Sequence, residues 1–357
     1  MQTSPRPHSR RTKYLAIASV LIVALFILAG CRASPPARVS ESEFLLGTVV
    51  TITIHDHQHA GAAINAAFDR AREIQALMSA NEADYDDTEL IRVNRNAGRR
   101  PVEVSDETFY VVTEAIRFAE MTGGAFDPTV LPLFRLWGMD SPDPAVPDER
   151  EIREVLELVG YEAVEIDPER RTVYLPRPGM QLDLGGIAKG YAVNESARVM
   201  REMGVNHAIL DFGGDIVTIG TRPDGSPWRI GVQHPGGQRG QFLGILGSVN
   251  ESVVSSGAYE RFFVENGVRY HHIFDPDTGM PSDAGPTSVT VVGPDATTTD
   301  ALSTAIFVMG VERGLELIAS LSGYEAIVST DDHRLYVTGG LAQRFEPRAE
   351  EYRRVTP

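Results

Sequence analysis

Apolar residues recur at helical spacing in several parts of the chain. The spacing covers Ala60–Met78, Glu107–Met121, Arg150–Val159 and Gly186–Met203. The second of these segments follows Ser105, a residue type that caps helices, and it stops at a Gly-Gly pair. Apolar residues that repeat every three to four positions form one stripe on a helix. The pattern therefore predicts four amphipathic helices.

Other segments alternate between apolar and polar residues, which is typical of strands. The alternation covers 44–55 and 208–212, and residues 213–293 are rich in β-branched residues and Gly/Pro turns. The C-terminal part predicts helices at 301–309 and 314–320 and strands at 325–329 and 335–338, whereas 81–100 is polar and rich in turn residues. No regular βαβ rhythm appears. We predict an α+β fold with antiparallel sheets, in one large domain of two packed lobes.

The N-terminus has the pattern of a lipoprotein signal peptide. Four basic residues precede the apolar run Leu15–Ala29, which is too short for a permanent membrane span and leads through small residues to Cys31. We expect residues 1–30 to be a signal peptide, Cys31 to carry lipid, 31–42 to be a flexible tether, 43–345 to fold and 346–357 to be a polar tail. An uncleaved N-terminal anchor is the alternative. Both place the protein outside the cytoplasm, attached to a membrane.

The net charge of the chain limits the kinds of ligand that the protein can bind. The net charge is −16, and without residues 1–30 the chain has 29 basic and 49 acidic residues, or −20. So acidic a protein disfavours nucleic acid and anionic lipid as ligands. Any phosphate-bearing ligand would need local cations or a metal.

One apolar helical segment carries an oxygen-rich face. In 300–310, Asp300, Ser303 and Thr304 stand at i, i+3 and i+4, which places them together on the predicted first turn. A buried carboxylate needs a partner, and Mg²⁺ accepts a carboxylate together with hydroxyl or carbonyl oxygens. The alternative is that Asp300 only caps the helix.

The segment QLDLGGIAKGY at 181–191 resembles a phosphate site without being a P-loop. Gly185 and Gly186 allow close approach of the backbone to a ligand, and Lys189 lies in the first turn of the following helix. Asp183 does not fit phosphate binding, because a carboxylate repels phosphate unless a metal intervenes. Tight packing between a strand and a helix is the alternative.

The segment YHHIFDPDTGMP at 270–281 has two adjacent histidines before a turn. If 270–275 is a strand, His272 shares a face with Tyr270 and Phe274, and His271 takes the other face. A histidine suits proton removal at neutral pH, although a structural histidine pair is the alternative. The segments GAFDP, LDFGGD and SSGAY are further candidates that turn chemistry alone would explain.

Taken together, GAFDP, DLGGIAKGYAV, LDFGGDI, SSGAYERFF, YHHIFDPDTGMP and TTTDALSTAIFVMG resemble, in order and spacing, the ApbE family of FAD:protein FMN transferases. The resemblance implies a T-fold-like α+β enzyme that is exported and commonly lipid-anchored. Such an enzyme cleaves FAD with Mg²⁺, releases AMP and attaches FMN by a phosphoester bond to a threonine of an acceptor protein. Acceptors include subunits of Na⁺-NQR-type and Rnf-type redox complexes.

The resemblance also implies roles for individual residues. His272 corresponds to the family's reacting centre, and Gly186, Asp300, Ser303 and Thr304 to its metal site. Contacts to the flavin nucleotide correspond to Leu46, Asn81, Ala125, Phe126, Asp127, Asp183, Lys189 and Phe274. Leu46 and Asn81 depart from the methionine and the aromatic residue that are frequent there, and Lys189 stands where some members have an acid. Two alternatives remain open: a Mg²⁺-dependent FAD pyrophosphatase and a non-catalytic FAD-binding lipoprotein.

Overall fold

The computed structural model describes residues 38–55, 57–238 and 240–355. From Arg38 onward the chain forms one compact unit. The predicted signal peptide, Cys31 and the first part of the predicted tether lie outside the described residues. Among the helices that are described, none combines the length and the apolar character that a membrane crossing requires.

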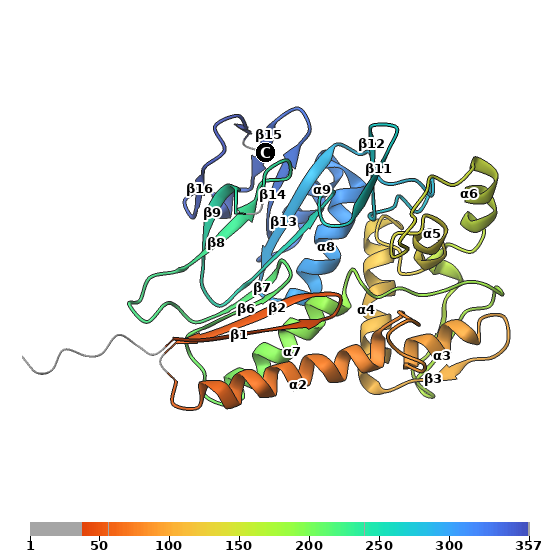
Figure 1. Ribbon diagram of the computed structural model, residues 1–357, viewed down its shortest axis with the longest axis horizontal. Helices are drawn as coiled ribbons and strands as arrows, with labels where there is room; N and C mark the ends of the chain where they lie inside the picture. Colours follow the sequence, from red (N-terminus) through yellow and green to blue (C-terminus); the bar gives the residue numbers. More distant parts are fainter. Residues whose placement is uncertain (1–37, 56, 239, 356–357) are drawn as a thin grey trace, which may run out of the picture. The chain divides into compact units, whose positions relative to one another are not determined.

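The main sheet has nine strands in the order β1-β2-β6-β7-β10-β13-β14-β15-β17 (Figure 1). All neighbours are antiparallel except β15 and β17. The strands are β1 (Arg38–Leu45), β2 (Thr48–His55), β6 (Ala208–Phe212), β7 (Asp215–Ile219), β10 (Ser252–Gly257), β13 (Pro286–Gly293), β14 (Glu325–Thr330), β15 (Arg334–Val337) and β17 (Arg353–Val355).

Three smaller sheets surround the main one. Their orders are β16-β9-β8, β3-β5-β4 and the hairpin β11-β12. The strands are β3 (Val102–Glu103), β4 (Glu165–Asp167), β5 (Thr172–Tyr174), β8 (Trp228–Gln233), β9 (Phe242–Ser248), β11 (Phe262–Glu265), β12 (Val268–His271) and β16 (Phe345–Pro347).

Periodicity predicts most of the described α-helices, but not Glu89–Arg95 and Leu131–Leu136. The helices are α2 (Ala60–Met78), α3 (Glu89–Arg95), α4 (Asp106–Thr122), α5 (Leu131–Leu136), α6 (Glu149–Leu156), α7 (Ala188–Glu202), α8 (Ala296–Met309) and α9 (Val311–Ser320), with short 3-10 turns at Tyr161–Ala163 and Gly339–Leu341. The predicted α+β class, with mixed helices and antiparallel sheets, is confirmed.

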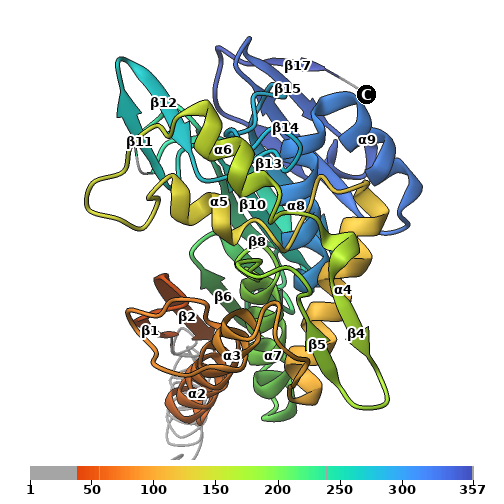
Figure 2. The same ribbon diagram turned by 90° about the vertical axis from the view of Figure 1, so that its right-hand side faces the viewer.

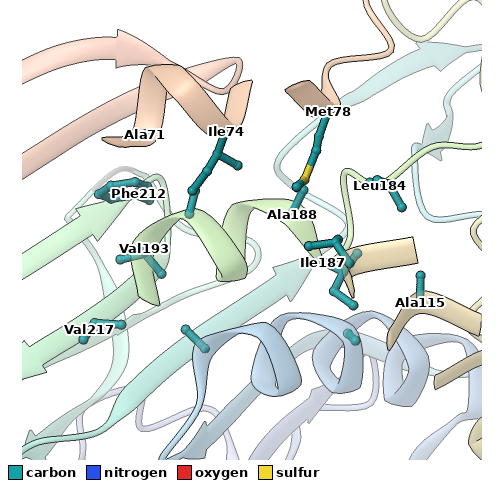
Figure 3. Packing of buried hydrophobic residues seen from close by; sticks show 14 of the residues in the cluster. Ala71, Ile74, Met78, Ala115, Leu184, Ile187, Ala188, Val193, Phe212 and Val217 are labelled. Carbon is teal, nitrogen blue, oxygen red and sulfur yellow. The ribbon is translucent and has the colours of Figure 1, made fainter. Parts of the chain in front are cut away.

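Two apolar layers hold the main sheet. Helices α2, α7 and α8 pack on one face, where Val291 of β13 is buried, and the sheet β16-β9-β8 packs on the other face, where the adjacent Val292 is buried. Side chains alternate between the faces of a strand, so β13 contributes to both layers. Figure 3 shows Ile74 and Met78 of α2 in the first layer, near Ile187 and Ala188.

A third apolar cluster lies around Trp137. It joins α5 and α6 to the hairpin β11-β12, and Figure 2 shows these elements close together. Phe263 and Tyr270 of the hairpin lie against the Trp137 ring. The indole of Trp137 donates a hydrogen bond to the carbonyl of Gly279 at 3.0 Å. This cluster fixes the base of the hairpin that ends at the two histidines.

The predicted single strand 44–55 is wrong, because a hairpin occupies this region. Leu46 and Gly47 both have positive φ, 53° and 70°, and this is the backbone of a tight two-residue turn. Residues 38–42, which we expected in the tether, belong to β1. Cross-strand hydroxyl pairs, such as Ser42 with Thr51 at 2.8 Å, stabilise this polar strand.

Three other boundaries differ from the sequence prediction. The expected polar tail contributes β17 and most of β16, and the expected turn-rich region contains α3, which Thr88 caps. Helix α8 begins at Ala296, with Asp295 as its cap. Asp300 is therefore neither the cap nor in the first turn, and the alternative that it serves only as a cap is wrong.

Gly190 sets the distance between α7 and α8. A Cβ on Gly190 would lie 2.2 Å from the Ala296 carbonyl oxygen, whereas a Cβ on Gly61 of α2 would meet nothing within 4 Å. We expect Gly190→Ala to lower the free energy of unfolding by about 1–3 kcal/mol through overpacking. The control Gly61→Ala should leave it unchanged or raise it by up to about 1 kcal/mol. Denaturant unfolding measures both, and equal effects would contradict the close contact.

Candidate active site

Segments that are distant in the sequence line one cavity of about 1150 Å³. The lining comes from the β1–β2 turn, the end of α2, the loop before α5, the start of α7, the end of β10 and the middle of α8. This volume exceeds the roughly 300–1,000 Å³ that is common for sites of drug-sized ligands. Every predicted site residue lines the cavity except Ser303 and Cys31, and Cys31 lies outside the described residues.

The loop that leads into α7 is anchored by alternate side chains. Leu182, Leu184 and Ile187 are buried, and Figure 3 shows Leu184 and Ile187 beside the apolar core. Asn94 of α3 bonds both the N–H and the carbonyl of Leu182, at 2.7 and 2.9 Å. Asp183 lies between two of these anchors and lines the cavity.

Asp183 is held in place by its neighbours. Its N–H donates to the Pro128 carbonyl at 2.7 Å, and its carboxylate accepts the N–H of Gly185 at 2.9 Å. Burial raises the pKa of Asp183 above its usual range. A half-buried carboxylate that lines a cavity fits a contact to a hydrogen-bond donor of the ligand.

An oxygen-rich part of the cavity lies where α8 approaches the loop that leads into α7. This cradle is formed by Asp300, Thr304 and the backbone of Gly186. Asp300 is only 3% exposed and accepts the N–H of Gly190 at 2.9 Å. The Thr304 hydroxyl would lie 3.5 Å from a Cβ on Gly186, so the absence of a side chain there leaves the backbone open to Thr304. One carboxylate, one hydroxyl and backbone oxygen are ligands that a hard cation accepts. No group of three or more His, Cys, Asp or Glu suited to a metal occurs among the described residues.

Ser303 lies behind this cradle. Its side chain is fully buried, and its hydroxyl donates to the Asp300 carbonyl at 2.9 Å. It also bonds Ser256 of β10 at 2.7 Å, and Ser256 in turn lies 3.3 Å from the Thr304 hydroxyl. Ser303 therefore supports the position of Thr304 through Ser256.

Lys189 connects the cradle to a second buried acid. Its Nζ bonds Asp215 of β7 at 2.5 Å, and the other carboxylate oxygen of the fully buried Asp215 has no hydrogen-bond partner among the described residues. Burial raises the pKa of Asp215, despite the lysine. Burial and the negative charge of Asp215 raise the pKa of Asp300 well above its usual range. Burial alone would lower the pKa of Lys189, but the two acids raise it.

Two carboxylates thus share one ammonium group in a buried place. If both acids ionise, one negative charge remains uncompensated, and this is costly in a low-dielectric environment. A proton or a cation would compensate it. The carboxylate of Asp300, the hydroxyl of Thr304 and the open backbone of Gly186 are ligands of the kind that a divalent cation accepts.

The two histidines differ in their surroundings. Strand β12 ends at His271, so the predicted strand through 275 and its face assignments are wrong. The ring of buried His271 donates to the Ser282 carbonyl at 3.1 Å and accepts the N–H of Ile273 at 3.3 Å. Both of its nitrogens are occupied, which makes His271 structural.

His272 keeps one ring nitrogen for chemistry. Its Nδ1 and its backbone N–H both donate to the carbonyl of Arg261, at 3.2 and 3.1 Å. Because a carbonyl only accepts, the proton sits on Nδ1 and Nε2 is the acceptor. Burial and the positive charge of Arg261 lower the pKa of His272 to about 3. The ring is therefore neutral at pH 7.

The predicted flavin contacts come from several segments of the cavity lining. Leu46 lies in the β1–β2 turn and donates its N–H to Gln75 at 3.0 Å, and Asn81 is exposed beyond the end of α2. Phe274 and Phe126 are buried apolar walls. The remaining contacts, Ala125 and Asp127, belong to the loop before α5.

Asp127 mainly shapes that loop. Its carboxylate accepts from the N–H and hydroxyl of Thr129, at 2.7 and 2.6 Å, and from the N–H of Tyr161 at 3.0 Å. These bonds occupy both carboxylate oxygens, so the side chain of Asp127 fixes the backbone that faces the cavity.

Sequence reasoning did not assign three residues that the structure brings to the site. Asp215, Ser256 and Arg261 occur in LDFGGDI and SSGAYERFF, segments that turn chemistry alone would explain. The available signal was an acid after a Gly-Gly pair in an apolar strand, since a buried acid needs a partner.

A large cavity lined by the buried Asp300, by Lys189 and by a neutral histidine is a candidate site for an extended ligand. The sequence model of the ApbE family matches residues 46–328. A FAD:protein FMN transferase of Treponema pallidum is 33% identical over 343 residues, which cover 91% of this chain and 94% of that protein.

Solved structures of similar proteins have the same fold as this chain. The ApbE protein of Thermotoga maritima superposes with a TM-score of 0.76 at 34% identity, covering 88% of this chain and 97% of the other. The flavin transferase ApbE of Vibrio cholerae gives 0.74 at 32% identity, with 84% and 96% covered. The chain belongs to the ApbE family.

The buried Asp300 leads to a prediction about stability and metal. Its raised pKa means that its contribution to stability is present below the ordinary pKa of an aspartate and is lost as the pH rises. Asp300→Asn should therefore raise the melting temperature at pH 7 without metal, by about 2–4 °C for each kcal/mol gained. Mg²⁺ should stabilise the unaltered protein but not this variant.

Asp183→Asn is the matched control, because Asp183 is a half-buried carboxylate of the same cavity whose pKa is also raised. This control should keep the Mg²⁺-dependent rise in melting temperature. An Asp300→Asn protein that responds to Mg²⁺ as the unaltered protein does would refute the cation site. Thermal unfolding with and without Mg²⁺ provides the measurement.

Proposed function

We propose that this protein is a FAD:protein FMN transferase. It cleaves the pyrophosphate of FAD, attaches FMN by a phosphoester bond to a threonine hydroxyl of an acceptor protein, and releases AMP. The observation that supports this most is that Asp300, Lys189 and the neutral His272 line one large cavity, with Lys189 bonded to the buried Asp215. Relatives of similar length that bear this activity in their names support it further.

Mg²⁺ is part of the proposal. Asp300, Thr304 and the backbone of Gly186 would hold it. A bound Mg²⁺ would neutralise charge on the pyrophosphate, which is the main requirement of phosphoryl transfer. The acidic surface of this protein supplies little of that positive charge itself.

His272 is the base in the proposed reaction. Its Nε2 accepts the proton of the acceptor threonine while that oxygen forms a bond to the phosphorus of FMN. The P–O bond to the AMP phosphate breaks, and AMP leaves with the electron pair. The Arg261 carbonyl keeps the ring in the tautomer that accepts at Nε2.

We further propose that the protein is exported and lipid-anchored through Cys31, facing extracytoplasmic acceptors such as subunits of Rnf-type or Na⁺-NQR-type complexes. The support is the signal-peptide pattern of residues 1–30 and the small residues before the cysteine. Metabolic labelling with a radioactive fatty acid tests the anchor. The unaltered protein should take up the label, and the control variant Cys31→Ser should not.

His272→Ala should keep FAD binding and lose transfer by a factor of about 10²–10⁴, because only the base is removed. Flavin fluorescence measures FAD binding, and release of AMP measures turnover. The matched variant His271→Gln should lower the melting temperature, since it loses the bond to Ser282, but retain activity. Transfer at the unaltered rate in His272→Ala would remove this residue from the mechanism.

The activity itself is tested with the soluble domain, FAD, Mg²⁺ and an acceptor domain encoded nearby. Intact mass measurement should show one added FMN unit on the acceptor, and an equal amount of AMP should appear. FMN and AMP release without any gain in acceptor mass would replace the proposal by a FAD pyrophosphatase. Binding of FAD without AMP release would leave a non-catalytic flavin carrier.

A further inference from the structure

Three basic side chains line the cavity in the described part of the chain: Arg135, Lys189 and Arg261. Lys189 is committed to the buried Asp215 at 2.5 Å. The two arginines have only loose acidic partners, Glu82 at 3.8 Å for Arg135 and Asp140 at 3.5 Å for Arg261. The arginines are therefore the side chains that retain positive charge for an anionic ligand.

Arg261 differs from Arg135 because it is bonded to the proposed base. Its carbonyl accepts both the Nδ1–H and the backbone N–H of His272. A displacement of Arg261 would therefore displace His272. No comparable bond between Arg135 and His272 occurs among the described residues.

The guanidinium of Arg261 lies at the junction of several cavity walls. Its Nη2 is 3.0 Å from the place of a Cβ on Gly47, in the β1–β2 turn. Its positive charge also favours the ionised form of Asp183, which lies in the loop before α7. The side chain is 45% exposed, which leaves room for it to turn toward a ligand.

We propose that Arg261 is a further catalytic residue, which binds the pyrophosphate oxygens of FAD with its guanidinium while its carbonyl orients His272. This inference rests on the proposed function. One residue then places both the positive charge and the base relative to the same phosphorus. Arginine suits this role because its fork of N–H groups binds two phosphate oxygens and stays charged.

The role of Arg261 is to stabilise the negative charge that develops during the reaction. The threonine oxygen forms the new bond to the FMN phosphorus, its proton goes to Nε2 of His272, and the bond to the AMP phosphate breaks. Negative charge moves to the departing AMP phosphate, where the guanidinium of Arg261 stabilises it by hydrogen bonds. Arg261 gives up no proton in this step.

Substitution of Arg261 isolates the guanidinium, because every variant keeps the carbonyl that holds His272. We expect Arg261→Gln to lower kcat for AMP release by about 10²–10³, the usual loss for one group that stabilises a transition state. Arg261→Lys should recover part of this loss, because it restores the charge without the fork. The dissociation constant of FAD should rise, and that of riboflavin, which has no phosphate, should not.

A pH profile separates this role from a structural one. Burial lowers the pKa of His272 most, the charge of Arg261 lowers it further, and His271 and Lys189 contribute less. The acid limb of kcat/KM should therefore move to higher pH in Arg261→Gln, toward the ordinary histidine value of about 6.5. Arg269→Gln is the matched control, because Arg269 lies on the same hairpin, over the Phe262 ring and outside the cavity lining.

The outcomes distinguish the two proposals. An unaltered protein that releases no AMP from FAD would refute the proposed function. An active unaltered protein together with an Arg261→Gln variant of equal kcat, equal FAD affinity and unchanged acid limb would refute this inference. If Arg261→Gln does not fold, as judged by thermal unfolding, Arg261→Lys carries the test: a kcat equal to that of the Arg269→Gln control would then overturn the role of the fork.

Discussion

The site depends on a buried arrangement of charges in which two carboxylates share one lysine. Asp215 comes from β7, Lys189 from α7 and Asp300 from α8, so the cluster ties a strand to two helices. The N–H of Gly190 completes it by bonding Asp300. The same glycine allows α7 and α8 to approach each other closely. Helix packing and the assembly of the site are therefore one feature of the structure.

Without a bound cation or ligand, this cluster of buried charges lowers the free energy of unfolding. Burial raises the pKa of Asp215 and of Asp300, which means that the surroundings of each carboxylate disfavour its charged form. The surrounding apolar layer offsets this, since the core-facing residues of α2, α7 and α8 are almost completely buried. Groups arranged in this way bind a cation or ligand strongly because binding relieves an existing imbalance.

His272 is positioned by backbone hydrogen bonds and not by buried charges. A single carbonyl, that of Arg261, receives two N–H groups of His272 and so fixes both the backbone and the ring. The hairpin β11-β12 joins these two residues, and its packing on Trp137 holds the hairpin in place. The backbone of Arg261 and the ring of His272 are consequently held together, and the apolar cluster under the hairpin holds the strands between them in place.

The sequence by itself determined the elements whose periodicity is strong. It predicted α2 with its observed bounds, β6 likewise, and the shared face of Asp300 and Thr304, because these depend on local spacing. It did not predict the β1–β2 turn, since Leu46 is a residue type that seldom adopts positive φ. It also extended the strand of the histidines past His271.

Only the tertiary structure decided which charges meet. Lys189 and Asp215 are separated by 26 positions, and no local pattern pairs them. The sequence showed an acid after two glycines and an arginine before two phenylalanines, but both fit ordinary turns. Their roles depend on burial and on partners from other elements, and these quantities exist only once the sheet, α7 and α8 have packed together.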